Sequence, residues 1–116
     1  MRFRHALPLL AFSIAFVLAQ TALGQTSQGR ISGQVTDASG GVVGKATVTI
    51  ENLGTHVKRV LETNTSGEYV APAIEPGFYS VTVEAPGFSK VIRGRVQVEV
   101  TNDIKLDFQL DRKSTL

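Results

Sequence analysis

The clearest pattern in the chain is an alternation of apolar and polar residues between two Pro-Gly pairs. Residues 78–84 read FYSVTVE, and their alternating apolar positions are Tyr79, Val81 and Val83. A period of two places one set of side chains on a buried face and the other in water. Because Pro presets φ and Gly accepts positive φ, Pro76-Gly77 and Pro86-Gly87 are typical of turns. The segment therefore predicts a central strand between two turns.

Similar short segments recur along the chain and predict seven or eight strands. They span residues 30–36, 45–52, 57–63, 68–71, 78–84, 88–93, 95–101 and 104–110. Residues 64–67 are expected to form a hairpin connection and residues 72–77 a loop, and no window after residue 24 shows helical spacing. Such spacing is typical of a sandwich or barrel. We expect a small antiparallel β-sandwich with a core of Ile31, Val35, Val48, Ile50, Tyr79, Val81, Val83, Val98, Ile104, Leu106 and Phe108.

The first 24 residues differ in composition from the rest of the chain. A basic start is followed by an apolar run over residues 6–19 and by the small residues Ala22 and Gly24. This layout predicts a secretory signal peptide, cleaved after Gly24. The run is shorter than the roughly 20 residues that span a bilayer, which argues against a membrane anchor. Residues 25–29 are then expected to be a disordered linker, residues 30–111 the domain and residues 112–116 a tail.

Loss of this leader would change the charge balance. The whole chain has 12 basic and 10 acidic residues, and without Arg2 and Arg4 it has 10 of each. A chain without net positive charge attracts phosphate backbones weakly, so nucleic acid is not expected as a partner. The remaining 92 residues (116 less 24) contain no cysteine and no expected membrane span. Burial and strand pairing must therefore stabilise the fold without disulfides.

The residue types give little support to catalysis. Zinc needs about four converging ligands, and after the leader the chain has one histidine, His56, and no cysteine. The glycine run at residues 40–44 lacks the Lys-Ser/Thr of a phosphate loop. Several loop residues offer oxygen ligands for calcium, although loop Asp and Asn more often bond their own turns; they are Asp37, Asn52, Asn64, Glu75 and Asp103. We predict no enzyme, no cofactor and no catalytic or metal site.

Two kinds of binding surface remain open. Sugar sites present aromatic side chains, and the chain has no Trp; Tyr69 and Tyr79 are expected in the core. Phe78, on the opposite face of its strand, is the best exposed candidate, followed by Phe88. An edge strand can also add to another sheet, and charges on edge strands oppose this. The charges of this kind are Lys58, Arg59, Arg93 and Arg95.

Three ordered motifs resemble the carboxypeptidase regulatory-like domain family. They are residues 33–48 (GQVTDASGGVVGKATV), 63–69 (TNTSGEY) and 76–88 (PGFYSVTVEAPGF), and the resemblance runs from about residue 30 to 110. The chain departs from the family at three turn positions. Val42, Lys45 and Asn64 stand where the family often has Pro, Gly and Asp.

The resemblance implies a seven-stranded Greek-key sandwich, similar to transthyretin (prealbumin), that acts as an accessory domain and not as a peptidase. Domains like this often follow the signal peptide of TonB-dependent outer-membrane receptors in Gram-negative bacteria. We therefore expect an exported module, periplasmic or outer-membrane-associated, with a structural or protein-interaction role beside an envelope protein such as that receptor. Without plug or barrel, it would be a stand-alone module or a truncated relative. The alternative is a carbohydrate-binding module of the starch-binding-like fold.

Overall fold

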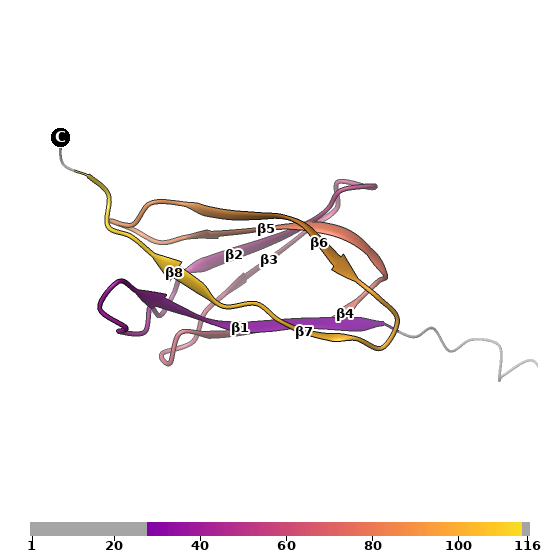
Figure 1. Cartoon of the computed structure of the whole chain (residues 1–116), viewed down its shortest axis with the longest axis horizontal. Helices are drawn as coiled ribbons and strands as arrows, with labels where there is room; N and C mark the ends of the chain where they lie inside the picture. The colour runs from indigo at the N-terminus through magenta and orange to yellow at the C-terminus, as the bar shows by residue number, and fades with distance from the viewer. Residues whose placement is uncertain (1–27, 115–116) are drawn as a thin grey trace, which may run out of the picture.

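Two β-sheets packed face to face form the structure (Figure 1), a computed structural model that describes residues 28–114. The first sheet contains β1 (Gly29–Asp37), β4 (Glu68–Ile74), β7 (Asp103–Lys105) and β8 (Phe108–Leu110). The second sheet has the order β3 (Lys58–Glu62), β2 (Thr47–Asn52), β5 (Gly77–Glu84) and β6 (Val91–Val98). The predicted all-β sandwich is confirmed. The predicted signal peptide lies outside the described residues, and within residues 28–114 no helix could cross a membrane.

The prediction of one continuous strand over residues 104–110 is wrong, because the segment is divided into β7 and β8. Both strands pair with β1 in parallel, so the sandwich is not wholly antiparallel as expected. At the break, the Gln34 backbone amide donates to Asp107 Oδ1 at 2.9 Å. The Asp107 side chain thus takes the place of the backbone carbonyl that would accept this hydrogen bond in a continuous strand. A Cβ on Gly33 would lie 1.9 Å from the Leu106 carbonyl oxygen, which only glycine permits. Counted as one interrupted strand, β7 and β8 complete the predicted seven-stranded, prealbumin-like sandwich.

Several predicted boundaries also differ from the structure. Residues 64–67 do not form a hairpin, because β3 belongs to the second sheet and β4 to the first. Residues 72–74 continue β4 instead of forming a loop, and β1 begins at Gly29, one residue before the predicted start. β6 runs through Gly94, where two strands were expected. Between the pairs Tyr79–Val96 and Val81–Arg93, β6 has one residue more than β5, so the register shifts opposite Ser80. Arg95, at this shift, has a φ of 52°.

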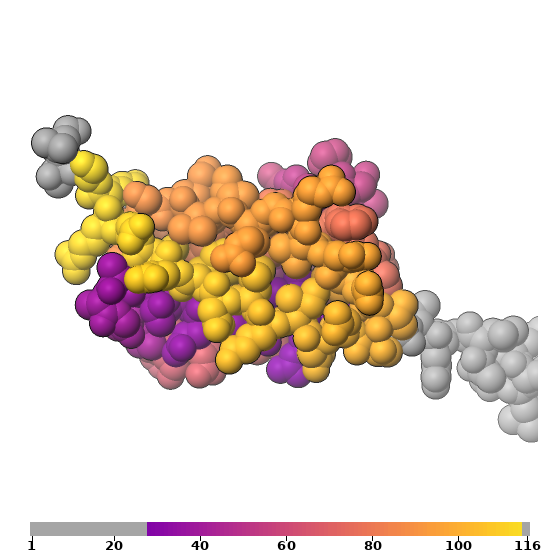
Figure 2. Space-filling view, viewed as in Figure 1, coloured from indigo at the N-terminus to yellow at the C-terminus, as the bar shows by residue number. Residues whose placement is uncertain are grey.

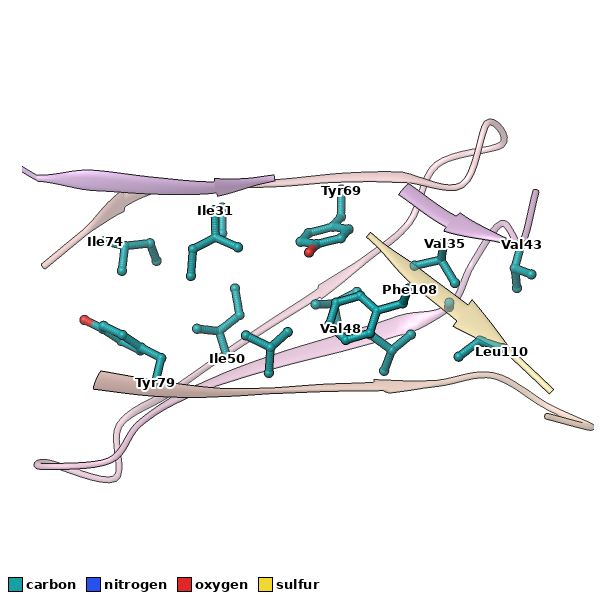
Figure 3. Packing of buried hydrophobic residues seen from close by; sticks show 14 of the residues in the cluster. Ile31, Val35, Val43, Val48, Ile50, Tyr69, Ile74, Tyr79, Phe108 and Leu110 are labelled. Atoms are coloured by element: carbon teal, nitrogen blue, oxygen red, sulfur yellow. The ribbon is translucent and has the colours of Figure 1, made fainter. Parts of the chain in front are cut away.

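The core lies between the sheets, where side chains from both interdigitate (Figure 3). Nine of the predicted core residues are buried, while Ile104 and Leu106 are partly buried at its margin. Burying each such side chain stabilises the fold by about 1.5–3 kcal/mol. Tyr69, also expected in the core, is buried, and the core contains further residues that the prediction did not include: Val43, Ala46, Ala71, Ile74 and Leu110.

The C-terminal segment closes one side of the sandwich. In Figure 2 the yellow segment that contains β8 lies between the indigo β1 and the orange β6. Beyond β8, the Ser89 amide donates to the Asp111 carbonyl and the Lys113 amide to the Gly87 carbonyl. The Phe88 amide donates to the Ala85 carbonyl and Gly87 has a φ of 81°, which confirms the predicted Pro86-Gly87 turn. The β3–β4 side is bridged instead by the Arg59 side chain, which donates to two carbonyls of β4.

Candidate interaction surface

The outer face of the second sheet, hereafter the outer face, carries the candidate site. Strand pairing places Val60 opposite Thr49, Thr49 opposite Thr82, and Thr82 opposite Ile92, which we call the middle row. The side chains alternate with the buried ones of each strand, so the whole row points away from the core. Val60 is 62% exposed and Ile92 is 59% exposed. The row is therefore a neutral strip across four strands, with a large aliphatic side chain at each end.

Charged rows flank the middle row on both sides. Toward one end of the strands, Glu62 and Glu84 both pair with Thr47, and these three residues form the acidic row. Lys90 and Lys113 line the same cleft as Thr47 and Glu84, so cations lie beside the acids of this row. The acidic row is thus one pleat away from the aliphatic side chains.

The other flank contains the Lys58 row, formed by Lys58, Glu51 and Ser80. Lys58 Nζ lies 3.7 Å from Glu51 Oε1. Arg95 joins this end of the outer face from β6, because its guanidinium lies over the outward-facing Phe78 ring. Both flanks of the middle row therefore carry charges of both signs.

The predicted exposed aromatic is confirmed but is already in contact with a cation. Phe78 is 43% exposed, and the Arg95 guanidinium carbon lies 5.3 Å from its ring centroid. A sugar that stacks on this side of the ring would have to displace the arginine. Phe88 is partly buried against the core, and Tyr69 and Tyr79 are buried as predicted. The described residues thus offer one accessible ring, partly covered.

The predicted edge charges lie on the two edge strands of the second sheet. Lys58 and Arg59 belong to β3, and Arg93 and Arg95 belong to β6. Arg59 donates from Nη1 to the Pro72 carbonyl and from Nη2 to the Ala73 carbonyl, at 3.2 Å for the latter. These positions support the interpretation that the charges oppose strand addition at both edges.

Three of the five candidate oxygen ligands, Asp37, Asn52 and Asn64, bond their own turns. Asp37 Oδ1 accepts from the hydroxyl of Ser39 at 2.6 Å and from the amides of Ser39 and Gly41, and these bonds lower the Asp37 pKa. Asn52 Oδ1 accepts from two amides at residues 54 and 55, and Asn64 Oδ1 from two at residues 66 and 68. Within residues 28–114, no group of three or more His, Cys, Asp or Glu could hold a metal. The His56 side chain is 78% exposed.

A cleft of about 630 Å³ opens between the sheets on the β3–β4 side. The residues that line it include Asn52, Val57, Arg59, Ala73, Glu75 and Tyr79. The Tyr79 hydroxyl donates to the Glu75 carbonyl at 2.6 Å, and the Arg59 guanidinium is bonded to the two β4 carbonyls. Its polar groups are therefore largely engaged with the backbone. Sequence reasoning missed this cleft because its residues come from separate segments that only the sandwich brings together.

Comparison with solved structures shows the same fold in proteins of different kinds. Catechol 1,2-dioxygenase from Acinetobacter radioresistens is 14% identical, with a TM-score of 0.60 over 78% of this chain and 54% of the enzyme. A proposed carbohydrate binding protein from Bacteroides uniformis is 21% identical, with a TM-score of 0.60 over 72% of this chain and 41% of that one. The minor pilin GBS52 of Streptococcus agalactiae is 12% identical, with a TM-score of 0.62 over 78% and 47%.

At these identities the likeness concerns the fold alone, and this chain spans about half the length of the dioxygenase. A comparison with curated proteins gave no match. The model of the carboxypeptidase regulatory-like domain matches residues 30–111. The chain therefore belongs to the carboxypeptidase regulatory-like domain family.

Proposed function

We propose that this chain is an exported, non-catalytic module that binds another protein at the cell envelope through its outer face. The observation that carries the proposal is the middle row, where Val60 and Ile92 are each more than half exposed. Contact with a protein would remove this aliphatic surface from water, the main favourable contribution to association. Membership of a family of accessory domains supports a binding role over a catalytic one.

The site of action in this proposal is the periplasm or the periplasmic side of the outer membrane of a Gram-negative bacterium. It rests on the predicted signal peptide, residues 1–24, and on the envelope receptors beside which similar domains occur. The partner would be an envelope protein, with a TonB-dependent outer-membrane receptor as the first candidate. Fractionation of cells that express the tagged full-length chain tests this part, because recovery in the cytoplasm would contradict it.

The binding surface is tested by capture from solubilised envelope fractions with the tagged full-length chain. Ile92→Glu places a charge in the middle row and is expected to abolish capture of envelope proteins. Val70→Glu is the matched control, because Val70 is a similarly exposed aliphatic residue, 48%, on a strand of the first sheet. Equal capture by both variants would overturn the assignment of the outer face.

Carbohydrate binding is the second candidate, favoured by the exposed ring of Phe78 and the likeness to the Bacteroides uniformis protein. Arg95 over this ring makes it the weaker candidate. A glycan array separates the two functions. Under the main proposal the array is silent, whereas a signal that free sugar competes and Phe78→Ala removes would favour the carbohydrate-binding module.

A further inference from the structure

We propose that the domain bears tension along its chain, with β1, β7 and β8 as a clamp between the points where the chain enters and leaves it. The start of β1 and the end of β8 lie at opposite ends of the sandwich (Figure 1). Leu110 pairs with Asp37, the last residue of β1. Gly29, at the other end of this nine-residue strand, lies roughly 26 Å away. This property goes beyond the proposed function and does not depend on the outer face.

The first and last strands of the domain are paired in parallel, so tension on the chain loads them in shear. β1 lies inside its sheet, with β4 on one side and β7 and β8 on the other. A pull on the chain before Gly29 and after Leu110 acts on β1 and β8 in opposite directions along the strand axis. The hydrogen bonds run across from strand to strand, so they share this load and must break together. A pull that separates the same strands from one end breaks them one after another.

Hydrogen bonds to β1 continue through the break between β7 and β8. On one side of the break, the Leu106 amide donates to the Ser32 carbonyl at 2.7 Å. On the other side, the Gln34 amide donates to Asp107 Oδ1 at 2.9 Å. From there β8 continues the pairing to the last residue of β1. The load is therefore carried across the interruption as well as along the two short strands.

Side-chain packing opposes the same sliding movement. Ile31 and Val35 of β1 and Leu110 of β8 are fully buried, so the two strands cannot slide past each other without drawing these side chains out of the core. Gly33 adds a steric stop, because a Cβ at this position would lie 1.9 Å from the Leu106 carbonyl oxygen. Tension draws β1 toward its own start, and the next side chain on this face to reach that point is that of Val35. Burial and steric contact therefore reinforce the hydrogen bonds of the clamp.

Single-molecule force spectroscopy of the full-length chain tests the clamp by comparing two directions of pull. In the first, tags at the two chain ends hold the protein and load β1 and β8 in shear. In the second, Ala38→Cys and Asp111→Cys provide thiol attachment points at exposed residues directly after β1 and β8. The chain has no cysteine of its own, and this pull peels β8 from β1. We expect a several-fold higher unfolding force in the first direction at the same loading rate.

Two variants separate the clamp from general stability. Asp107→Ala removes the acceptor of the Gln34 amide, and held by the chain ends it is expected to unfold on the order of fivefold faster at a fixed force. Thr63→Val is the control, because Thr63 bonds Val43 and Ala46, outside the clamp. It should melt at a lower temperature by circular dichroism and keep the wild-type unfolding rate under force. An equal acceleration in both variants would show that global stability, and not the clamp, sets the resistance.

The clamp and the proposed function can fail separately. Ile92 lies on β6 of the second sheet, so Ile92→Glu should lose capture of envelope proteins and keep the wild-type unfolding force. Equal unfolding forces in the two directions of pull would overturn the clamp and leave the outer face as a binding surface. Full capture by Ile92→Glu, together with a higher force from the chain ends, would overturn the binding surface and keep the clamp.

Discussion

Arg59 and Arg93 stand at the two ends of a single row across the second sheet, with Ile50 and Val81 between them. The two core residues are buried, so the arginines that share their face also point toward the first sheet. Arg59 reaches two carbonyls of β4, and the guanidinium of Arg93 lies 5.4 Å from the Phe108 ring centroid. This row therefore has core residues in its middle and an arginine at each edge of the sheet. The middle row, one residue further along each strand, lies on the opposite face of the same sheet.

Replacing Arg59 should promote aggregation. Arg59→Met removes the inward charge from the β3 edge and the donor from the Pro72 and Ala73 carbonyls. We expect faster aggregation by light scattering and a loss of about 1 kcal/mol in the free energy of unfolding. Arg30→Met is the control, because Arg30 is an exposed arginine on β1, a strand that has neighbours on both sides. Equal aggregation rates for the two variants would mean that the inward charge does not protect this edge.

Tyr69 should make the fold sensitive to alkaline pH. Its hydroxyl donates to the Leu106 carbonyl at the break between β7 and β8. Burial, assisted by the nearby Asp107 charge, raises the Tyr69 pKa above its ordinary value of 10.0. A raised pKa in the folded state stabilises below the ordinary value, and this contribution is lost as the pH rises through the folded pKa. Stability should therefore decline above about pH 10.

Tyr69→Phe separates this effect from general alkaline damage. At pH 7 we expect a loss of about 1 kcal/mol, because the Leu106 carbonyl loses its donor. Above pH 10 the variant should decline less steeply than the wild type in urea titrations. Tyr79→Phe, which removes the bond to the Glu75 carbonyl, is the control. Parallel pH profiles for Tyr69→Phe and the wild type would show that the Tyr69 hydroxyl is not responsible.

Thr63 should stabilise the fold through its hydroxyl. It is 3% exposed, and Oγ1 donates to the Val43 carbonyl at 2.8 Å and accepts from the Ala46 amide at 2.9 Å. Thr63→Val keeps the shape and leaves two buried backbone groups without this partner, which should destabilise by about 2 kcal/mol. The exposed Thr65→Val is the control, and chemical denaturation measures both. A Thr63→Val variant as stable as the control would contradict the assignment.

Lys45 should tolerate glycine better than alanine. It has a φ of 57°, a left-handed conformation that β-carbon-bearing residues adopt at a disadvantage of roughly 1–2 kcal/mol. Lys45→Gly relieves this strain, although the freedom that glycine gains in the unfolded chain offsets about 0.5–1 kcal/mol. We expect Lys45→Gly to be at least as stable as the wild type and clearly more stable than Lys45→Ala in thermal melts. The opposite order would show that the conformation is not strained.

Local sequence was sufficient wherever one short segment determines the conformation. β5 was predicted from Phe78 to Glu84 because its two faces meet different surroundings, and the structure extends it by one residue, Gly77. The Pro86-Gly87 turn depends only on the preferred φ angles of its own residues. Lys45, noted as a departure from a family glycine, proved to have positive φ. The family also followed from ordered local motifs.

The tertiary structure alone decided which strands pair and what each surface presents. The sequence around Asn64 is typical of a turn, and the structure has a crossover there because β4 pairs with β1 in the other sheet. β7 and β8 pair in parallel with a strand about 70 residues earlier, a choice that depends on the packing of both sheets. The inward direction of Arg59 and the alignment of Val60 with Ile92 likewise follow from register between strands. The period of two determines which side chains of a strand share a face, whereas the assembly of the two sheets determines what that face contacts.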